Sequence, residues 1–82
     1  MTLKIISPKE ILFEGEVKIV TLPGAMGKFT VLKNHASIIS SLVKGTVSFN
    51  QNEAAENENT RKVEITGGIA VVKNNIVSVC LS

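Results

Sequence analysis

Residues 22–36 read Leu-Pro-Gly-Ala-Met-Gly-Lys-Phe-Thr-Val-Leu-Lys-Asn-His-Ala, and the rest of the chain is best understood outward from this stretch. An apolar run reaches Pro23 and Gly24, turns, and restarts at Gly27 with alternating apolar and polar residues. Proline fixes φ near about −65° and glycine tolerates positive φ, so the pattern predicts a β-hairpin. The returning strand opens into a second loop that carries His35, the only histidine in the sequence.

The composition is typical of one small folded domain. The chain has 82 residues, of which 44% are hydrophobic and 20% are charged, so we expect residues 1–82 to form a single domain. It contains no Trp or Tyr and three Phe, which predicts a mainly aliphatic core. A chain of this size buries only roughly 60–65% of its unfolded surface. A partner that covers more apolar surface would therefore stabilise it.

Charge and cysteine usage exclude several classes of protein. The net charge is +2 and Arg61 is the only arginine, so we expect no binding to nucleic acid. Cys80, the single cysteine, cannot form an intrachain disulfide, and its place between Val79 and Leu81 predicts a buried, inert thiol. No apolar run approaches the ~20 residues that span a bilayer, so we expect no direct membrane insertion.

Short alternating segments separated by turn residues predict an all-β fold, a small antiparallel β-sandwich of about eight to ten short strands. The expected strands cover residues 2–7, 11–15, 16–22, 27–32, 38–43, 46–49, 61–66, 69–73 and 76–82. In the third strand, alternation places Val17 and Ile19 on one face and Val20 on the other. Asn74 and Asn75 suit a two-residue type I′ turn because asparagine tolerates positive φ.

Two segments allow more than one interpretation. The apolar spacing in residues 38–43 also fits two turns of helix, but its β-branched residues favour a strand. Residues 50–60 have no apolar periodicity and indicate a solvated loop, with room for a frayed helical turn at residues 53–56. An acidic metal-binding loop is the competing interpretation, but the segment lacks fixed carboxylate spacing and the glycine of a calcium loop.

No group of residues predicts catalysis, a metal or a cofactor. A zinc site needs three or four ligands, whereas His35 and Cys80 are the only histidine and cysteine. Gly24, Gly27 and the Gly67–Gly68 pair are not followed by a P-loop pattern, so turn geometry explains them better. A competing function is a small β-barrel that binds a ligand or peptide, with a cavity between Val17, Phe29 and Val47. A barrel this small has little interior volume after its own side chains fill it.

The ordered set of motifs resembles the N-terminal β-sandwich domain of the epsilon subunit of rotary F-type ATP synthases. The matching residues are Ser7-Pro8, Phe13, Gly15-Glu16-Val17, Thr21-Leu22-Pro23-Gly24, Gly27, Phe29-Thr30-Val31-Leu32, His35-Ala36, Leu42, Gly45, Gly67-Gly68 and Val71. They run in order along nearly the whole chain. Family members often carry an acidic residue where Lys28 stands. The C-terminal helical hairpin of the family has no counterpart in these 82 residues, so neither inhibition nor nucleotide binding is inferred.

The resemblance implies a flattened ten-stranded sandwich that acts as a non-catalytic subunit of the central stalk. It would link the gamma subunit to the c-subunit ring, so that proton translocation is coupled to ATP synthesis at the cytoplasmic face of the cell membrane. Family members touch the c ring with loops at one end of the sandwich, and here Lys28, Lys33, Asn34 and His35 match those positions. Ile38, Ile39 and Leu42 would lie on the surface that faces gamma.

Overall fold

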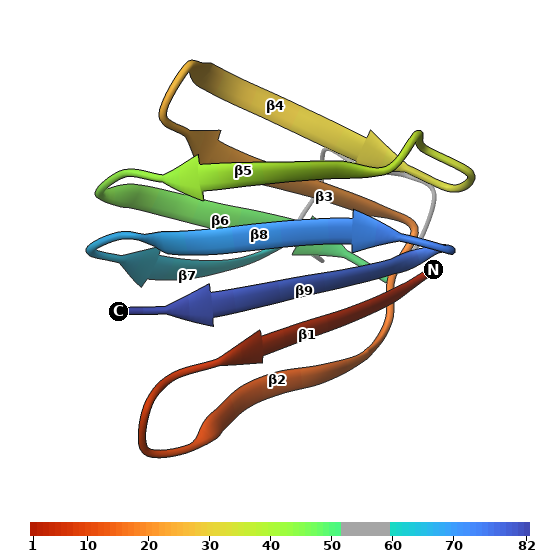
Figure 1. Cartoon of the computed structure of the whole chain (residues 1–82). Helices are drawn as coiled ribbons and strands as arrows, with labels where there is room; N and C mark the ends of the chain where they lie inside the picture. The colour runs from red at the N-terminus through yellow and green to blue at the C-terminus, as the bar shows by residue number, and fades with distance from the viewer. Residues whose placement is uncertain (52–59) are drawn as a thin grey trace.

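Nine β-strands make up the computed structural model, which describes residues 1–51 and 60–82 (Figure 1). The strands are β1 (Thr2–Ile6), β2 (Ile11–Glu16), β3 (Ile19–Gly24), β4 (Gly27–Leu32), β5 (Ile38–Leu42), β6 (Gly45–Asn50), β7 (Arg61–Ile65), β8 (Gly68–Lys73) and β9 (Ile76–Leu81). None of the described residues belongs to a helix that could cross a membrane. The helical turn considered for residues 53–56 lies outside the described residues.

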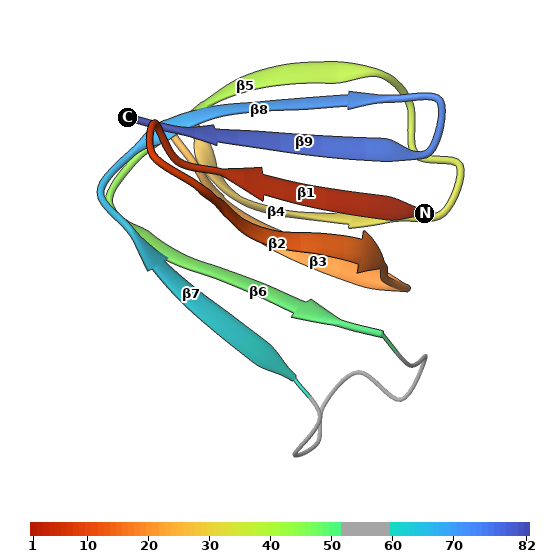
Figure 2. The same ribbon diagram turned by 90° about the horizontal axis from the view of Figure 1, so that it is seen from below.

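The strands form one continuous sheet that curls into two layers (Figure 2). One layer has the strand order β2-β1-β9-β8-β5, and the other has the order β4-β3-β6-β7. The layers join where β5 meets β3 through the pair Leu42 and Gly24. The predicted all-β sandwich is therefore confirmed.

The core lies between the layers and is almost entirely aliphatic. Strand side chains alternate between the two faces of a sheet, so each strand contributes every second residue. The buried hydrophobic residues are Leu3, Ile5, Val17, Val20, Leu22, Val31, Leu42, Val47, Phe49, Ile65, Ala70, Val72, Val77 and Val79. Val17, Val47 and the adjoining Phe29, which would line the cavity of a ligand-binding barrel, pack in this core instead.

An aromatic contact closes the open side of the curled sheet. The rings of Phe13 on β2 and Phe49 on β6 have centroids 4.4 Å apart. The guanidinium carbon of Arg61, at the start of β7, lies 5.2 Å from the Phe13 centroid and 5.6 Å from the Phe49 centroid. A cation over these ring faces adds electrostatic attraction to the apolar contact. The only arginine in the sequence thus joins the edges of the two layers.

The β3–β4 hairpin confirms the prediction from residues 22–36. Leu22 pairs with Phe29 and Gly24 pairs with Gly27, which leaves a two-residue turn between the strands. Gly27 has φ of 127°, and a Cβ on Gly24 would lie 2.7 Å from the Gly27 carbonyl oxygen. A side chain would therefore overlap the turn at Gly24 and would strain the backbone at Gly27.

Three features differ from the sequence predictions. Val17 faces the core with Val20 and does not share a face with Ile19, because Val17 lies before β3 begins and the alternation restarts there. β1 and β9 pair in parallel, whereas an antiparallel sandwich was expected. This pair joins the first and last strands, so the whole chain between them serves as the long connection that parallel strands need. Cys80 is exposed, not buried, because Val77 and Val79 point into the core and fix the outward direction of Cys80.

Candidate functional site

The loop after β4 is fixed by contact with the β8–β9 turn. The Asn34 N–H donates a hydrogen bond of 2.6 Å to Oδ1 of Asn75. The His35 N–H donates one of 3.1 Å to the Leu32 carbonyl, and His35 Nδ1 donates one of 2.7 Å to the Ala36 carbonyl. Both His35 and Lys33 are exposed, so the loop presents them to solvent in a defined position.

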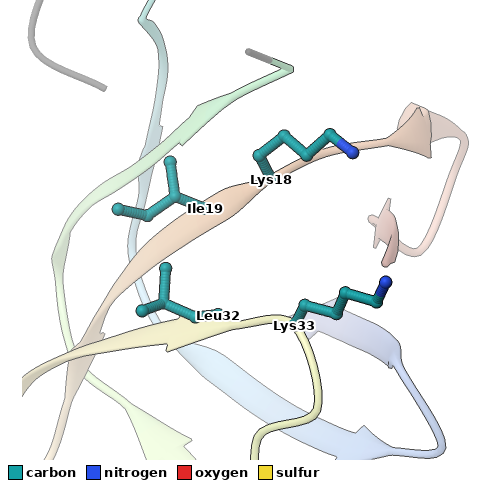
Figure 3. Close-up of a pocket in the computed structure, with 4 residues that line it drawn as sticks. All are labelled: Lys18, Ile19, Leu32 and Lys33. Carbon is teal, nitrogen blue, oxygen red and sulfur yellow. The ribbon is translucent and has the colours of Figure 1, made fainter. Parts of the chain in front are cut away.

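A surface pocket of about 360 Å³ lies beside this loop, at the start of β3 and the end of β4 (Figure 3). Its four lining residues are Lys18, Ile19, Leu32 and Lys33. Ile19 and Leu32 are direct partners in the β3–β4 register and lie side by side. The two lysine side chains extend to the same side of the pocket. The pocket therefore combines an apolar surface with two cations, an arrangement that the sequence analysis did not identify.

Lys28 lies apart from this loop. It follows the β3–β4 turn at the start of β4, whereas Lys33, Asn34 and His35 follow the end of that strand. The strand between them spans roughly 17 Å. The structure thus brings Lys33, Asn34 and His35 together but places Lys28 at the opposite end of β4, and not at the same end of the sandwich as expected.

A second exposed surface covers the outer face of β5, β8 and β9. Ile39 is 76% exposed, Ile69 is 50% exposed and Ile76 is 47% exposed. Ile39 pairs with Val71, Ile69 pairs with Cys80 and Ile76 pairs with Lys73, so the exposed isoleucines are spread over the outer face of the three strands. Three large exposed aliphatic residues on one sheet face make this face a candidate surface for contact with another protein.

The predicted gamma-facing residues divide between this outer face and the core. Ile39 is on the outer face, while Leu42 is 6% exposed and belongs to the core. Ile38 points inward but also lines a shallow hollow of about 410 Å³ beside Ile39 and Val71. Because residues alternate along β5, the three predicted residues cannot share one outer surface. The candidate surface is therefore corrected to Ile39 with Val71, Ile69 and Ile76, with Ile38 at its margin.

The outer face becomes charged on β1 and β2. Lys4 Nζ lies 3.7 Å from a carboxylate oxygen of Glu14, and the Thr2 hydroxyl donates a hydrogen bond of 2.6 Å to Glu16. That hydrogen bond, followed by the hydrogen bond and the charge of the Met1 amino group, holds the pKa of Glu16 below its usual value. The outer face therefore carries exposed isoleucines on β5, β8 and β9 and interacting polar side chains on β1 and β2.

The described residues, 1–51 and 60–82, contain no group of side chains arranged for catalysis or metal binding. No group of three or more His, Cys, Asp or Glu side chains in these ranges could hold a metal ion. His35 bonds to a backbone carbonyl, which gives it a structural role in the loop.

Residues 1–82 match the family described as "ATP synthase, Delta/Epsilon chain, beta-sandwich domain". The chain belongs to this family. The resemblance inferred from the ordered motifs is therefore confirmed, and the match extends over the full 82 residues.

Curated relatives of this ATP synthase delta/epsilon-type chain are similar along most of its length. It is 34% identical over 79 residues to the ATP synthase epsilon chain of Leptospira borgpetersenii serovar Hardjo-bovis, covering 96% of this chain and 58% of that one. It is 38% identical over 79 residues to that of Campylobacter lari, with the same coverage of 96% and 58%. For Rickettsia typhi the identity is 40% over 76 residues, with coverage of 93% and 67%. The chain thus spans less than two thirds of the length of the first two relatives.

Solved structures share the fold of this delta/epsilon-type chain. A chain in the cryo-EM structure of the Euglena gracilis mitochondrial ATP synthase, OSCP/F1/c-ring, superposes with a TM-score of 0.81 at 22% identity, covering 96% of this chain and 48% of that one. A chain of the Tetrahymena thermophila mitochondrial ATP synthase central stalk/c-ring structure has a TM-score of 0.77 at 15% identity, with coverage of 99% and 62%. At these identities the similarity shows the fold.

Proposed function

We propose that this chain is a non-catalytic subunit of the central stalk of an F-type ATP synthase, where it links the gamma subunit to the c ring. The observation that carries the proposal is the family match over residues 1–82, together with relatives named ATP synthase epsilon chain. The solved structures that share this fold are an ATP synthase OSCP/F1/c-ring assembly and an ATP synthase central stalk/c-ring assembly. In this role the chain would help couple proton translocation to ATP synthesis.

The proposed gamma-binding surface is the outer face of β5, β8 and β9 with its exposed isoleucines. Exposed aliphatic side chains on a sheet face gain free energy when another protein removes them from water, at about 25 cal/mol per Å² of apolar surface. Ile39, at 76% exposure, offers the most surface of the three isoleucines on this face. A small domain such as this one would also gain stability from the contact.

The proposed c-ring surface is the β4 edge with the loops at its two ends. Among the described residues β4 pairs with β3 alone, so its other edge is open. Lys28 stands at one end of β4, and Lys33, Asn34 and His35 follow its other end. A contact of the c ring along the whole of β4 would include both Lys28 and the group at the other end of the strand. The chain would then be a peripheral protein at the cytoplasmic face of the cell membrane.

Co-purification from native membranes tests this function. Tagged chain should retain both gamma and the c ring. Replacing Ile39 with serine should weaken gamma binding, and reversing charge with Lys28→Glu should weaken ring binding with little effect on folding, because an exposed charge contributes little to stability. Lys62→Glu on β7 provides a charge-matched control. Recovery of the chain without gamma and without the ring would count against the proposal.

The alternative of a ligand-binding barrel is not favoured. Its cavity was expected between Val17, Phe29 and Val47. Val17 is 1% exposed and Val47 is fully buried, and both belong to the aliphatic core against which Phe29 packs.

A further inference from the structure

We propose that the pocket formed by Lys18, Ile19, Leu32 and Lys33 binds an acidic side chain of the c ring together with a neighbouring aliphatic side chain. This inference rests on the function proposed above, because it describes the chemistry of the partner that the end of β4 would meet. It extends that function by adding Lys18, Ile19 and Leu32 to the contact.

The apolar part of the pocket is preformed. Ile19 and Leu32 are cross-strand partners, and Leu32 is 53% exposed although its side chain is fully aliphatic. A partner's aliphatic side chain placed over this pair would remove apolar surface from water on both molecules. Burial by a partner accounts for a large aliphatic residue at the exposed end of β4.

The cationic part of the pocket is only weakly compensated within the described residues, because the charge of Lys18 acts on Glu16 only as the smallest of the causes that lower the pKa of that carboxyl. Neither Lys18 nor Lys33 forms an ion pair with another described residue. Glu16 lies close to Lys18 in the sequence, but its carboxylate already accepts a hydrogen bond of 2.6 Å from Thr2 and lies 3.3 Å from the Met1 amino group. The two ammonium groups extend to the same side of the pocket, and this arrangement favours a negatively charged partner (Figure 3).

The backbone holds both lysines in place before any partner binds. The Lys18 N–H donates a hydrogen bond of 2.8 Å to the Asn50 carbonyl. On the other side, the Leu32 carbonyl accepts the His35 N–H, and Asn34 bonds to Asn75 directly after Lys33. A preorganised backbone reduces the conformational entropy that binding removes.

The shape of the pocket favours a protein side chain over a small molecule. Sites for small molecules enclose most of the ligand surface, whereas this pocket is an open hollow with four lining residues. Phosphate groups are bound through backbone N–H groups and arginine forks as well as lysine. Here the Lys18 N–H is already bonded to Asn50, and the lining residues include no arginine.

Binding of purified c ring to the full chain tests the proposal. We compare wild type with the charge reversal K18E/K33E and with L32S, and we measure gamma binding in parallel. K18E/K33E should weaken ring affinity by about tenfold or more and flatten its salt dependence, because it replaces two attractive contacts by repulsive ones. L32S should weaken ring affinity without changing the salt dependence. Neither change should affect gamma binding.

The matched control is K9E/K62E, which makes the same change of charge in the β1–β2 turn and on β7, away from the pocket. It should bind the ring within about twofold of wild type, since a general electrostatic attraction by the whole protein is weak at physiological salt. An equal loss of ring affinity in K9E/K62E and in K18E/K33E would overturn the proposal. If K18E/K33E lowers the melting temperature, K18Q/K33Q replaces it, and a loss of ring affinity is still expected.

The outcomes separate this inference from the rotor function. If wild type binds the ring and K18E/K33E binds it equally well, the pocket assignment is wrong while the rotor function stands. If wild type binds neither ring nor gamma, both are overturned. Inorganic phosphate that displaces the ring better than chloride at equal ionic strength would mean that the pocket takes a phosphate group, and the acidic side chain would be rejected.

Discussion

Asn34 and Asn75 bind each other through two hydrogen bonds, although they lie 41 residues apart in the sequence. The Asn34 N–H donates to Oδ1 of Asn75 at 2.6 Å, and Nδ2 of Asn75 donates to Oδ1 of Asn34 at 3.0 Å. Both residues have positive φ, 64° and 62°. The pair ties the loop after β4 to the β8–β9 turn, so the exposed side chains of Lys33 and His35 extend from a fixed backbone.

This pair predicts the effect of Asn75→Gly. Glycine keeps the positive φ of the turn but removes the side-chain amide, so the turn should persist while the loop is released. We expect hydrogen exchange at the Asn34 N–H to accelerate by about fivefold, which corresponds to one lost hydrogen bond. Amide exchange measured by NMR checks this. Asn74→Gly, at the other positive-φ residue of the same turn, is the control, and equal exchange rates in both variants would contradict the role of Asn75.

Gly68 predicts a large loss of stability on substitution. Its φ is 155°, and a Cβ would lie 2.3 Å from the Cys80 carbonyl oxygen on the neighbouring strand. Gly68→Ala should therefore lower the free energy of unfolding by about 2–4 kcal/mol through backbone strain and overlap. Gly27 has φ of 127° with open space around it, so Gly27→Ala should cost only about 1–2 kcal/mol. Urea denaturation of both variants is the measurement, and equal losses would show that overlap at Gly68 is unimportant.

Glu16 should titrate below the usual range of a glutamate. The main cause is the hydrogen bond from the Thr2 hydroxyl, followed by the hydrogen bond and charge of the Met1 amino group. Thr2→Val should therefore raise the pKa of Glu16 towards its ordinary value. An NMR titration of the Glu16 side chain measures this change. A pKa that stays the same in Thr2→Val would mean that the hydroxyl has no part in the shift.

The lowered pKa also fixes the sign of a pH effect on stability. A carboxyl group whose pKa is lowered on folding stabilises the native state above its unfolded pKa of about 4.5, and this contribution is lost as the pH falls through the folded pKa. Glu16→Gln should therefore reduce stability at neutral pH, and the difference from wild type should shrink in acid. The free energies of unfolding of wild type and Glu16→Gln, measured at neutral and at acidic pH, test this prediction. A difference between the two proteins that does not change with pH would contradict it.

The hairpin could be predicted from the sequence because its signals are local. Pro23, Gly24 and Gly27 specify the turn, and alternation after Gly27 separates Phe29 and Val31 from Thr30 and Leu32. The turn at Asn74 and Asn75 is equally local, and its positive φ values of 53° and 62° confirm the prediction.

Features that depend on contacts between distant strands could not be predicted from local sequence signals. One face would hold all three of Ile38, Ile39 and Leu42 only if the segment were a helix. The segment forms a strand, which divides these residues between the surface and the core. Val17 and Lys18 lie between β2 and β3, so alternation restarts and Val17 faces the core together with Val20. The two-lysine pocket arises from the register of Ile19 with Leu32, which no local pattern specifies.

In the proposed assembly, the chain joins the central stalk through the outer face of β5, β8 and β9. Cys80 lies on this face beside Ile69 and is the only thiol in the chain. The most direct measurement is therefore the rate at which a neutral maleimide modifies Cys80 in the free chain and in the complex with gamma. We predict rapid modification of the free chain and a rate at least about tenfold lower in the complex, because a protein interface excludes the reagent. Equal rates in the two states would contradict the claim.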